Sequence, residues 1–335
     1  QFYPLSTFLT EYSEKNGGNT YRPVAIGRYG IRTRESIYSK ELAKDYSKNK
    51  LIHKNTLTVG MGSVQIDIGV LTDDITYSVS PAYHTYKIAG VNAEYLRYCL
   101  ECRNQDMFSR FVKRGSRQGK TIDLKRWLTY EIPVYDENRQ QEIVDRLNQI
   151  SELIEKRREQ LVQLSELVKS RFIELFGDPL KNDKDFPTIL GETLFKLSNG
   201  RALPNNKRFT VGIPAYGGNG ISWYTDEILC DYDTVIIGRV GFQSGNVHLA
   251  KAPLWVTDNA MYISWINNKE YDIRFLCSLM EHIDFKRYQD AGDLKKITQK
   301  PFMQMYYLMP PLSLQKQYIA FVEQTDKSKL CGKME

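Results

Sequence analysis

Residue types that often carry catalysis or bind metals are few and scattered in this 335-residue chain. Four histidines occur, none of them in an HExxH motif: His53, His84, His248 and His282. Of the five cysteines, only Cys99 and Cys102 form a CxxC pair, and a structural zinc site would need a second pair. The sequence therefore predicts no metal site and no cofactor.

Motifs that mark the common enzyme classes are also missing from the sequence. It has no GxSxG nucleophile elbow, no phosphate-binding GxxxxGK[ST] loop and no GxGxxG after a strand. The nearest match to a DNA adenine methyltransferase motif, Met309-Pro310-Pro311-Leu312, lacks both the polar first and the aromatic last residue. Three Asp-x-Lys triplets, at 123–125, 284–286 and 293–295, have no upstream acid in a defined strand. We expect no catalytic residue.

Basic and polar side chains, in contrast, recur around glycines in loop-like segments. Lysine and arginine can hold DNA phosphates, while arginine, asparagine, glutamine and serine can recognise base edges. The segment 110–126 carries seven cations against one acid, and 285–300 is basic at the corresponding place later in the chain. The candidate DNA-binding residues are Arg28, Tyr29, Arg32, Arg34, Arg114, Ser116, Arg117, Gln118, Lys120, Arg201, Asn205, Asn206, Lys207, Arg208, Tyr216, Asn219, Lys295, Lys296 and Lys300.

The charge distribution agrees with a polyanionic partner. Residues 1–135 hold 20 lysines and arginines against 13 acids, whereas residues 136–177 hold 7 against 9. A basic segment of this kind favours nucleic acid, although any single basic loop is about as often only a solvated surface.

One long helix is expected between two stretches of mixed sequence. Residues 139–176 contain no proline, and apolar residues recur there with heptad spacing, so we expect a helix of roughly 57 Å. Arg157 and Arg171 interrupt this apolar seam. The seam consists of Ile143, Leu147, Ile150, Ile154, Leu161, Leu164, Val168 and Leu175.

The two flanking stretches follow the same order of features. Strand–turn–strand patterns at 57–71 and 234–250 are each followed by helical patterns, at 92–112 and 269–288. Single matches support an internal repeat, among them Gly62 with Gly241, Tyr83 with Tyr262, Ile122 with Ile297, Trp127 with Phe302, and Gln140 with Gln315. The predicted fold is α+β: two similar mixed α/β domains related by a pseudo-two-fold axis and joined by long antiparallel coiled-coil helices.

The segment "QQEIVDRLNQISELIEKRREQLVQLSELVKSRFIELFGD" resembles the central region of specificity (S, or HsdS) subunits of type I restriction–modification systems, and "PPLSLQKQYIAFVEQTDKSKL" resembles the start of their second conserved region. "IPAYGGNGISWYTDE" and the Gly-x-x-Gly-Phe stretch from Gly238 resemble their target-recognition domains. The resemblance implies target-recognition domains at 1–135 and 178–311, a spacer helix at 136–177 and a second helical region at 312–335.

Further expectations follow from this resemblance. It implies that the chain binds a bipartite double-stranded DNA target in the cytoplasm without itself catalysing a reaction. Its partners would be two methyltransferase (M) subunits and the restriction (R) subunits. Because the second helical region spans only about 25 residues, the first helix could lack part of its partner, which would leave room for self-association or an M subunit. Two alternatives stay open: a coiled-coil protein-interaction module without DNA binding, and the recognition part of a self-sufficient restriction–modification enzyme.

Overall fold

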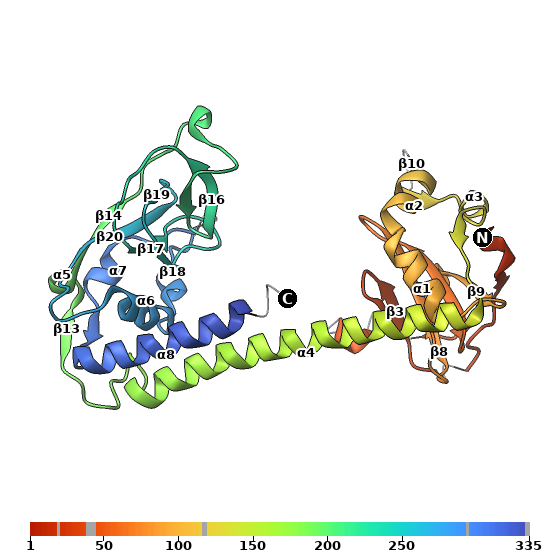
Figure 1. The fold of residues 1–335 in the computed structure, drawn as a ribbon, viewed down its shortest axis with the longest axis horizontal. Coiled ribbons are helices and arrows are strands. Elements are labelled where there is room, and N and C mark those ends of the chain that lie inside the picture. Colours follow the sequence, from red (N-terminus) through yellow and green to blue (C-terminus); the bar gives the residue numbers. More distant parts are fainter. Residues whose placement is uncertain (19–20, 38–44, 116–118, 293–294, 332–335) are drawn as a thin grey trace. The chain divides into compact units, whose positions relative to one another are not determined.

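The computed structural model describes residues 1–18, 21–37, 45–115, 119–292 and 295–331 (Figure 1). The chain forms two compact units, Gln1–Glu155 (unit 1) and Lys156–Glu335 (unit 2). Helix α4, Glu137–Phe176, contributes residues to both units, and its 40 residues confirm the long helix predicted at 139–176.

Unit 1 is built on an antiparallel sheet of four strands in the order β2-β9-β6-β7. Leu57 and Val59 of β6 pack on one side into a core that includes α1, α2 and Val144 of α4. Val24 and Ile26 of the β3–β4 hairpin pack with Leu71 into a second, smaller core. The elements are β1 Phe2–Pro4, η1 Leu5–Thr7, β2 Leu9–Tyr12, β3 Val24–Gly27, β4 Gly30–Thr33, η2 Arg34–Ser36, β5 Lys50–Ile52, β6 Thr56–Met61, β7 Ile66–Leu71, β8 Tyr77–Val79, β9 His84–Ile88, α1 Ala93–Cys102, α2 Asn104–Phe111, β10 Val112–Gly115, β11 Gly119–Ile122, α3 Leu124–Trp127 and β12 Glu131–Pro133.

Unit 2 has a sheet of the same kind, in the order β14-β20-β17-β18. Val235 and Ile237 of β17 face the larger core, which holds α6, whereas Ile236 faces the smaller core near the β15–β16 hairpin. The elements are β13 Thr188–Leu190, α5 Gly191–Leu194, β14 Phe195–Asn199, η3 Asn205–Lys207, β15 Ile213–Gly217, β16 Gly220–Thr225, β17 Thr234–Gly238, β18 Val247–Ala250, β19 Trp255–Val256, β20 Ala260–Ile266, α6 Ile273–Glu281, η4 Phe285–Tyr288, α7 Lys300–Met303, β21 Tyr306–Leu308 and α8 Leu312–Cys331.

The two units therefore repeat one topology, as the order of sequence features predicted. Trp127 and Phe302 are both fully buried, on the equivalent short helices α3 and α7. The predicted match of Tyr83 with Tyr262 is wrong, because Tyr83 precedes β9 whereas Tyr262 lies within β20. Tyr83 instead packs against Gly60, where an added Cβ would lie 2.3 Å from its ring. The predicted pseudo-two-fold axis stays a prediction.

A buried glutamine is the most telling shared detail. In unit 1, the Gln140 side chain accepts a hydrogen bond from the Asn92 backbone N–H (2.9 Å) and donates one to the Tyr135 carbonyl (2.8 Å). In unit 2, Gln315 accepts from the Asp272 backbone N–H (2.9 Å) and donates to the Pro310 carbonyl (2.8 Å). Asn92 and Asp272 are the N-caps of α1 and α6. Each glutamine thus fixes the start of one helix to the start of another.

In unit 2, α8 runs antiparallel to the second half of α4. Tyr318, near the start of α8, contacts the rings of Phe172 and Phe176, while Arg157 donates hydrogen bonds to the carbonyls of Ser328 and Lys329 near its end. Arg157 interrupts the apolar seam, but it satisfies carbonyls in the last turns of α8 that have no partner within the helix.

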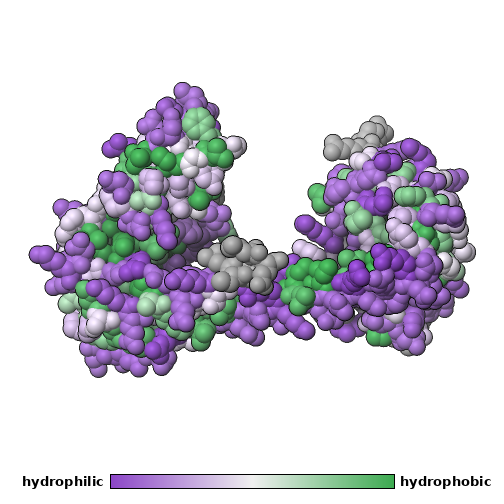
Figure 2. Space-filling view, viewed as in Figure 1, coloured by the Kyte–Doolittle hydropathy of each residue, from purple (hydrophilic) through white to green (hydrophobic). Residues whose placement is uncertain are grey.

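The apolar seam of α4 is only partly buried. Val168 and Leu175 pack against the unit 2 core, and Ile143 packs against the unit 1 core. Ile150 and Ile154 differ from the predicted packed seam, because they are 52% and 47% exposed and neighbouring Leu153 is 65% exposed. Within unit 2, the last turns of α8 contact α4 at Arg157. Apolar surface is visible along the middle of α4 in Figure 2.

Candidate nucleic-acid interface

The β3–β4 hairpin of unit 1 presents a compact group of cations around one tyrosine. Arg28 and Tyr29 form its tip, between the paired residues Gly27 and Gly30. Tyr29 is 71% exposed, and the guanidinium carbons of Arg32 and Arg28 lie 5.3 Å and 5.9 Å from its ring centroid. This arrangement offers cations for phosphate oxygens and an aromatic face for a base or sugar.

Local packing holds this tip in place. Ile26 is buried in the smaller core of unit 1, and its carbonyl accepts a 3.1 Å hydrogen bond from the Tyr83 hydroxyl. Gly30 has a φ of +75°, a conformation that glycine adopts without strain and that a tight hairpin requires. Arg34, just after the hairpin, lies with its guanidinium carbon 5.3 Å from the Tyr46 ring centroid.

The β15–β16 hairpin is the equivalent element of unit 2, and its tip contains a different residue set. Tyr216 and Asn219 lie at this tip, and Gly217 pairs with Gly220. An added Cβ on Gly218 would lie 3.2 Å from the Gly238 Cα and 3.9 Å from the Arg239 nitrogen, so the tip touches the backbone where β17 ends and the β17–β18 loop begins. The sequence "YGGNG" is thus a tight hairpin turn that also brings Asn219 close to a second loop.

Two cations of the segment preceding β15, Arg208 and Lys207, interact with neighbouring groups of the protein. Arg208 lies with its guanidinium carbon 4.6 Å from the Trp223 ring centroid, and its Nε donates to the Leu203 carbonyl. Lys207 forms ion pairs with Asp226 (3.4 Å) and Glu227 (3.1 Å), and the hydrogen bonds that it donates to Glu227 and Asp226 raise the pKa of Lys207. Neighbouring carboxylates therefore offset the charge of Lys207, which weakens its attraction for a phosphate.

Three other candidates from this segment are less constrained. Asn205 and Asn206 are exposed in η3. The backbone of Arg201 is fixed by hydrogen bonds with the Val256 carbonyl (2.8 Å) and the Trp255 indole N–H (3.0 Å), while its side chain is exposed.

The basic segment 110–126 was predicted as a loop, but it forms the β10–β11 hairpin followed by α3. Arg114 pairs with Lys120 across this hairpin, and Ser116, Arg117 and Gln118 lie outside the described residues. The Lys120 ammonium binds the Ser63 carbonyl and lies 5.4 Å from the Phe108 ring centroid. Lys120 thus joins the hairpin to the β6–β7 loop.

Segment 295–300 occupies the corresponding place in unit 2. The Lys295 carbonyl accepts a hydrogen bond from Gly241 (2.8 Å), and the Lys296 carbonyl accepts one from Asp290 (2.9 Å). Lys295, Lys296 and Lys300 are exposed, so their ammonium groups are open to a ligand. In both units the basic segment is joined to the loop that follows the central strand.

Sequence reasoning missed two exposed aromatic residues near the candidate cations. Trp223 stacks with Arg208 and is 40% exposed. Phe242, in the β17–β18 loop, is 82% exposed. The stretch Gly238-Arg239-Val240-Gly241-Phe242 contained the signal, because an aromatic residue directly after a glycine in a turn seldom belongs to a core. Only the structure of the loop shows that Phe242 is exposed.

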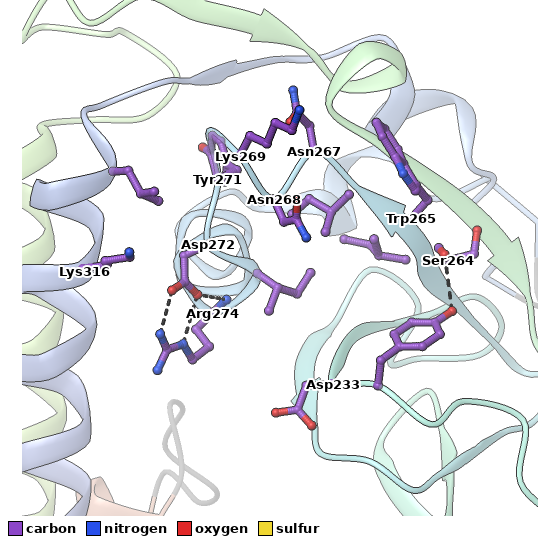
Figure 3. Close-up of a pocket in the computed structure, with 15 residues that line it drawn as sticks. Asp233, Ser264, Trp265, Asn267, Asn268, Lys269, Tyr271, Asp272, Arg274 and Lys316 are labelled. Atoms are coloured by element: carbon purple, nitrogen blue, oxygen red, sulfur yellow. Dashed lines mark hydrogen bonds and ion pairs between the residues drawn. The ribbon is translucent and has the colours of Figure 1, made fainter.

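A pocket of unit 2 has a different character from these surfaces (Figure 3). It is an open hollow of about 760 Å³ between the end of β20 and the start of α6. Arg274 pairs there with Asp272 (2.7 Å) and Glu323 (2.5 Å), joining α6 to α8. Burial raises the pKa of Asp272, but hydrogen bonds from Arg274 outweigh it, and the net shift is downward. These charged groups bind one another, which indicates a structural role.

The described residues also bear on metal binding and membrane insertion. No group of three or more histidine, cysteine, aspartate or glutamate side chains within them is arranged to hold a metal ion. Within the same residues, no helix combines the length and apolar character needed to cross a bilayer.

Comparison with known proteins finds a family match for the first half of the chain and a shared fold for all of it. Residues 7–164 match the model of the type I restriction modification DNA specificity domain. The S subunit of a type I system from M. genitalium has the same fold, with a TM-score of 0.65 at 16% identity over 100% of this chain and 91% of that chain. A chain from a structural study of complex assembly and conformational transition in a type I R-M system matches with a TM-score of 0.50 at 14% identity, over 100% of this chain and 92% of that chain.

No curated protein matches the sequence significantly. The family match and the shared fold agree with the chemistry of the site, which offers paired surfaces of cations and aromatic residues on a repeated scaffold. Residues 7–164 therefore carry a type I restriction modification DNA specificity domain, and the whole chain shares the fold of the S subunit of a type I system.

Proposed function

We propose that each unit recognises one half of a bipartite DNA target and that the two halves have different sequences. The observation that carries this proposal is the pair of equivalent hairpins. On the same scaffold, β3–β4 presents Arg28 and Tyr29, whereas β15–β16 presents Gly218 and Asn219. Equivalent positions with different hydrogen-bonding groups would select different bases.

The proposed division of labour follows the predicted boundaries. Residues 1–135 and 178–311 act as target-recognition domains, and 136–177 with 312–335 provide the helical spacer. Two weak recognition elements joined in one chain bind far more tightly than either alone, because the second contact becomes intramolecular. We infer that a rigid α4 sets the spacing of the half-sites.

The proposal assigns methylation and cleavage to partner subunits and none to this chain. Two M subunits and the R subunits would assemble with it. The exposed apolar residues of α4, Ile150, Leu153 and Ile154, offer a contact for an M subunit. Burial of such side chains is the main driving force of protein association.

The test is to map methylated bases in cells that contain the M subunit with this chain or with a variant. Replacing Arg28, Tyr29 and Arg32 together with alanine should relax or abolish one half-site and leave the other unchanged. Lys181→Ala provides a matched control, since this lysine side chain is 78% exposed and far along the sequence from both hairpins. An unchanged methylation pattern in the triple variant would contradict the assignment.

Binding to DNA in vitro separates this function from a protein-interaction role. The affinity should fall steeply with salt, by a slope of about 0.9 for each phosphate contact on a plot of log K against log salt. A chain that binds its M subunit but shows no salt-dependent DNA affinity would instead be an interaction module.

A further inference from the structure

The β17–β18 loop of unit 2, residues 239–246, holds an aromatic side chain in an unusual setting. Phe242 is 82% exposed, more than any other large apolar side chain in the part of the chain that the structure describes. Exposure of a phenylalanine ring to water has a free-energy cost, because burial of such a side chain is favourable in folding and binding. A single exposed apolar residue is common, so its surroundings must decide whether it has a role.

The loop that carries Phe242 is held by many backbone hydrogen bonds. Gly238 bonds with Asn246 (2.8 Å), Gly245 with Gly238 (2.8 Å) and Ser244 with Gly241 (3.0 Å). Outside the loop, Gly241 donates to the Lys295 carbonyl (2.8 Å), and the Gln289 side chain donates to the Ser244 carbonyl (2.7 Å). These hydrogen bonds therefore fix the backbone of the loop on which Phe242 is exposed.

Glycines make this support possible. Gly241 and Gly245 have φ angles of +88° and +89°, which side chains other than glycine rarely adopt. At Gly245 an added Cβ would lie 3.2 Å from the Lys286 backbone nitrogen, so the loop packs tightly on η4. The local structure thus fixes the backbone on both sides of the exposed ring.

One cation contacts the ring, and others lie on the segments that hold the loop. The Lys286 ammonium lies 5.5 Å from the Phe242 ring centroid, and Arg287, Lys295 and Lys296 are exposed on the segments that brace the loop. Asp284 and Asp290 are also exposed there, but Asp284 accepts the Lys286 N–H as the N-cap of η4. An apolar tip among cations fits a ligand that combines a polyanionic backbone with flat apolar faces, which is the chemistry of DNA.

Resting on the proposed function, we propose that Phe242 is a wedge that inserts its ring at a base step in the half-site bound by unit 2. The neighbouring lysines and arginine hold the adjacent phosphates while the ring replaces some of the lost base stacking. A braced loop suits this task, because a mobile side chain would fold back onto the protein and would not separate the stacked bases.

Unit 1 supplies an internal comparison. Its equivalent β6–β7 loop is shorter, residues 62–65, and carries Val64, which is 61% exposed. Valine has no flat ring to stack on a base. The distortion is therefore expected in one half-site only, the one bound by unit 2.

The test uses the full-length chain with its M subunit and duplexes of the mapped target. In these duplexes 2-aminopurine stands at each position in turn, apart from the methylated base, because unstacking raises its fluorescence. The wild-type complex should give a fluorescence increase at one step of the unit 2 half-site. Phe242→Ala should remove this increase and weaken binding roughly 5- to 140-fold, the range of base–aromatic stacking. Phe242→Trp should keep both.

Two controls isolate the effect. Tyr306→Ala removes another exposed aromatic residue of unit 2, on the β13–β21 sheet, and Val64→Ala alters the loop of unit 1; both should leave the fluorescence unchanged. Wild-type fluorescence that is flat across the half-site, or unchanged affinity and fluorescence in Phe242→Ala, would overturn the wedge. Loss of M-subunit assembly in Phe242→Ala with intact stacking would also overturn it. Absence of salt-dependent DNA binding by the wild-type complex would instead refute the proposed function.

Discussion

Replacement of Gln315 tests whether the buried glutamine joins α8 to the rest of unit 2. The side chain is fully buried and makes three hydrogen bonds, with the Asp272 N–H (2.9 Å), the Glu270 carbonyl (3.0 Å) and the Pro310 carbonyl (2.8 Å). At about 1 kcal/mol for each bond, Gln315→Met should lower the free energy of unfolding by about 3 kcal/mol. Methionine has a similar volume, so the change removes the bonds without opening a large cavity.

Gln140→Met is the matched variant in unit 1. Gln140 makes two equivalent bonds, with Tyr135 before α4 and with Asn92 at the start of α1, so we expect a loss of about 2 kcal/mol. For domains of this size, 1 kcal/mol shifts the melting temperature by roughly 2–4 °C. The expected shifts are therefore about 6–12 °C for Gln315→Met and about 4–8 °C for Gln140→Met.

Calorimetry would measure the melting temperatures, and hydrogen exchange would show which unit is affected. Each variant should increase exchange at the start of its own helix, α6 or α1, and leave the other unit unchanged. The reasoning fails if Gln315→Met stays within about 0.5 kcal/mol of the wild type, the usual range for surface substitutions. It also fails if either variant loosens both units equally.

Three further outcomes are expected. Burial lowers the pKa of His282, whose ring centroid lies 3.8 Å from that of Phe172. As the pH falls through about 6.5, the unfolded chain gains a proton at this histidine while the folded chain does not, so unit 2 should lose stability below that pH. His282→Phe should reduce this loss, as measured by melting curves at about pH 7.5 and 5.5. The double variant Ile150→Ser with Leu153→Ser should leave the melting temperature of the free chain unchanged within about 2 °C but weaken M-subunit assembly in size-exclusion chromatography, and full assembly would contradict a contact there. Arg157→Ala should cost about 1–2 kcal/mol and speed hydrogen exchange in the last turns of α8, whereas unaltered exchange would show that its bonds to Ser328 and Lys329 do not stabilise them.

The sequence was sufficient for the elements whose pattern is local. Heptad spacing and the absence of proline predicted a helix at 139–176. Helix α4 starts two residues earlier, at Glu137, and ends at Phe176 as predicted. Alternating apolar residues between glycines predicted the β6–β7 and β17–β18 pairs. The match of Gln140 with Gln315 located a shared contact, because a buried polar side chain needs the same partners wherever the scaffold recurs.

Features that depend on tertiary packing were not predictable in this way. Heptad spacing could not show that Ile150 and Ile154 are exposed, since it describes the helix and not the length of its partner. The sequence suggested that the charge of Lys207 is available to DNA. The fold brings Asp226 and Glu227, the two residues after β16, into ion pairs with it. Glycines in segment 110–126 suggested an irregular loop, but the backbone pairs Gly115 with Gly119 across a hairpin.

The repeated scaffold separates the residues that stabilise the cores from those that we propose determine specificity. Buried positions keep their role between the units, as Trp127 and Phe302 do, although the side chains differ. Hairpin tips and the following loops keep their place and change their chemistry, from Tyr29 to Asn219 and from Val64 to Phe242. Because the tips contribute little to either core, they can change with little effect on folding. If these positions recognise DNA as we propose, new targets can arise by substitution there while the helices that join the units stay the same.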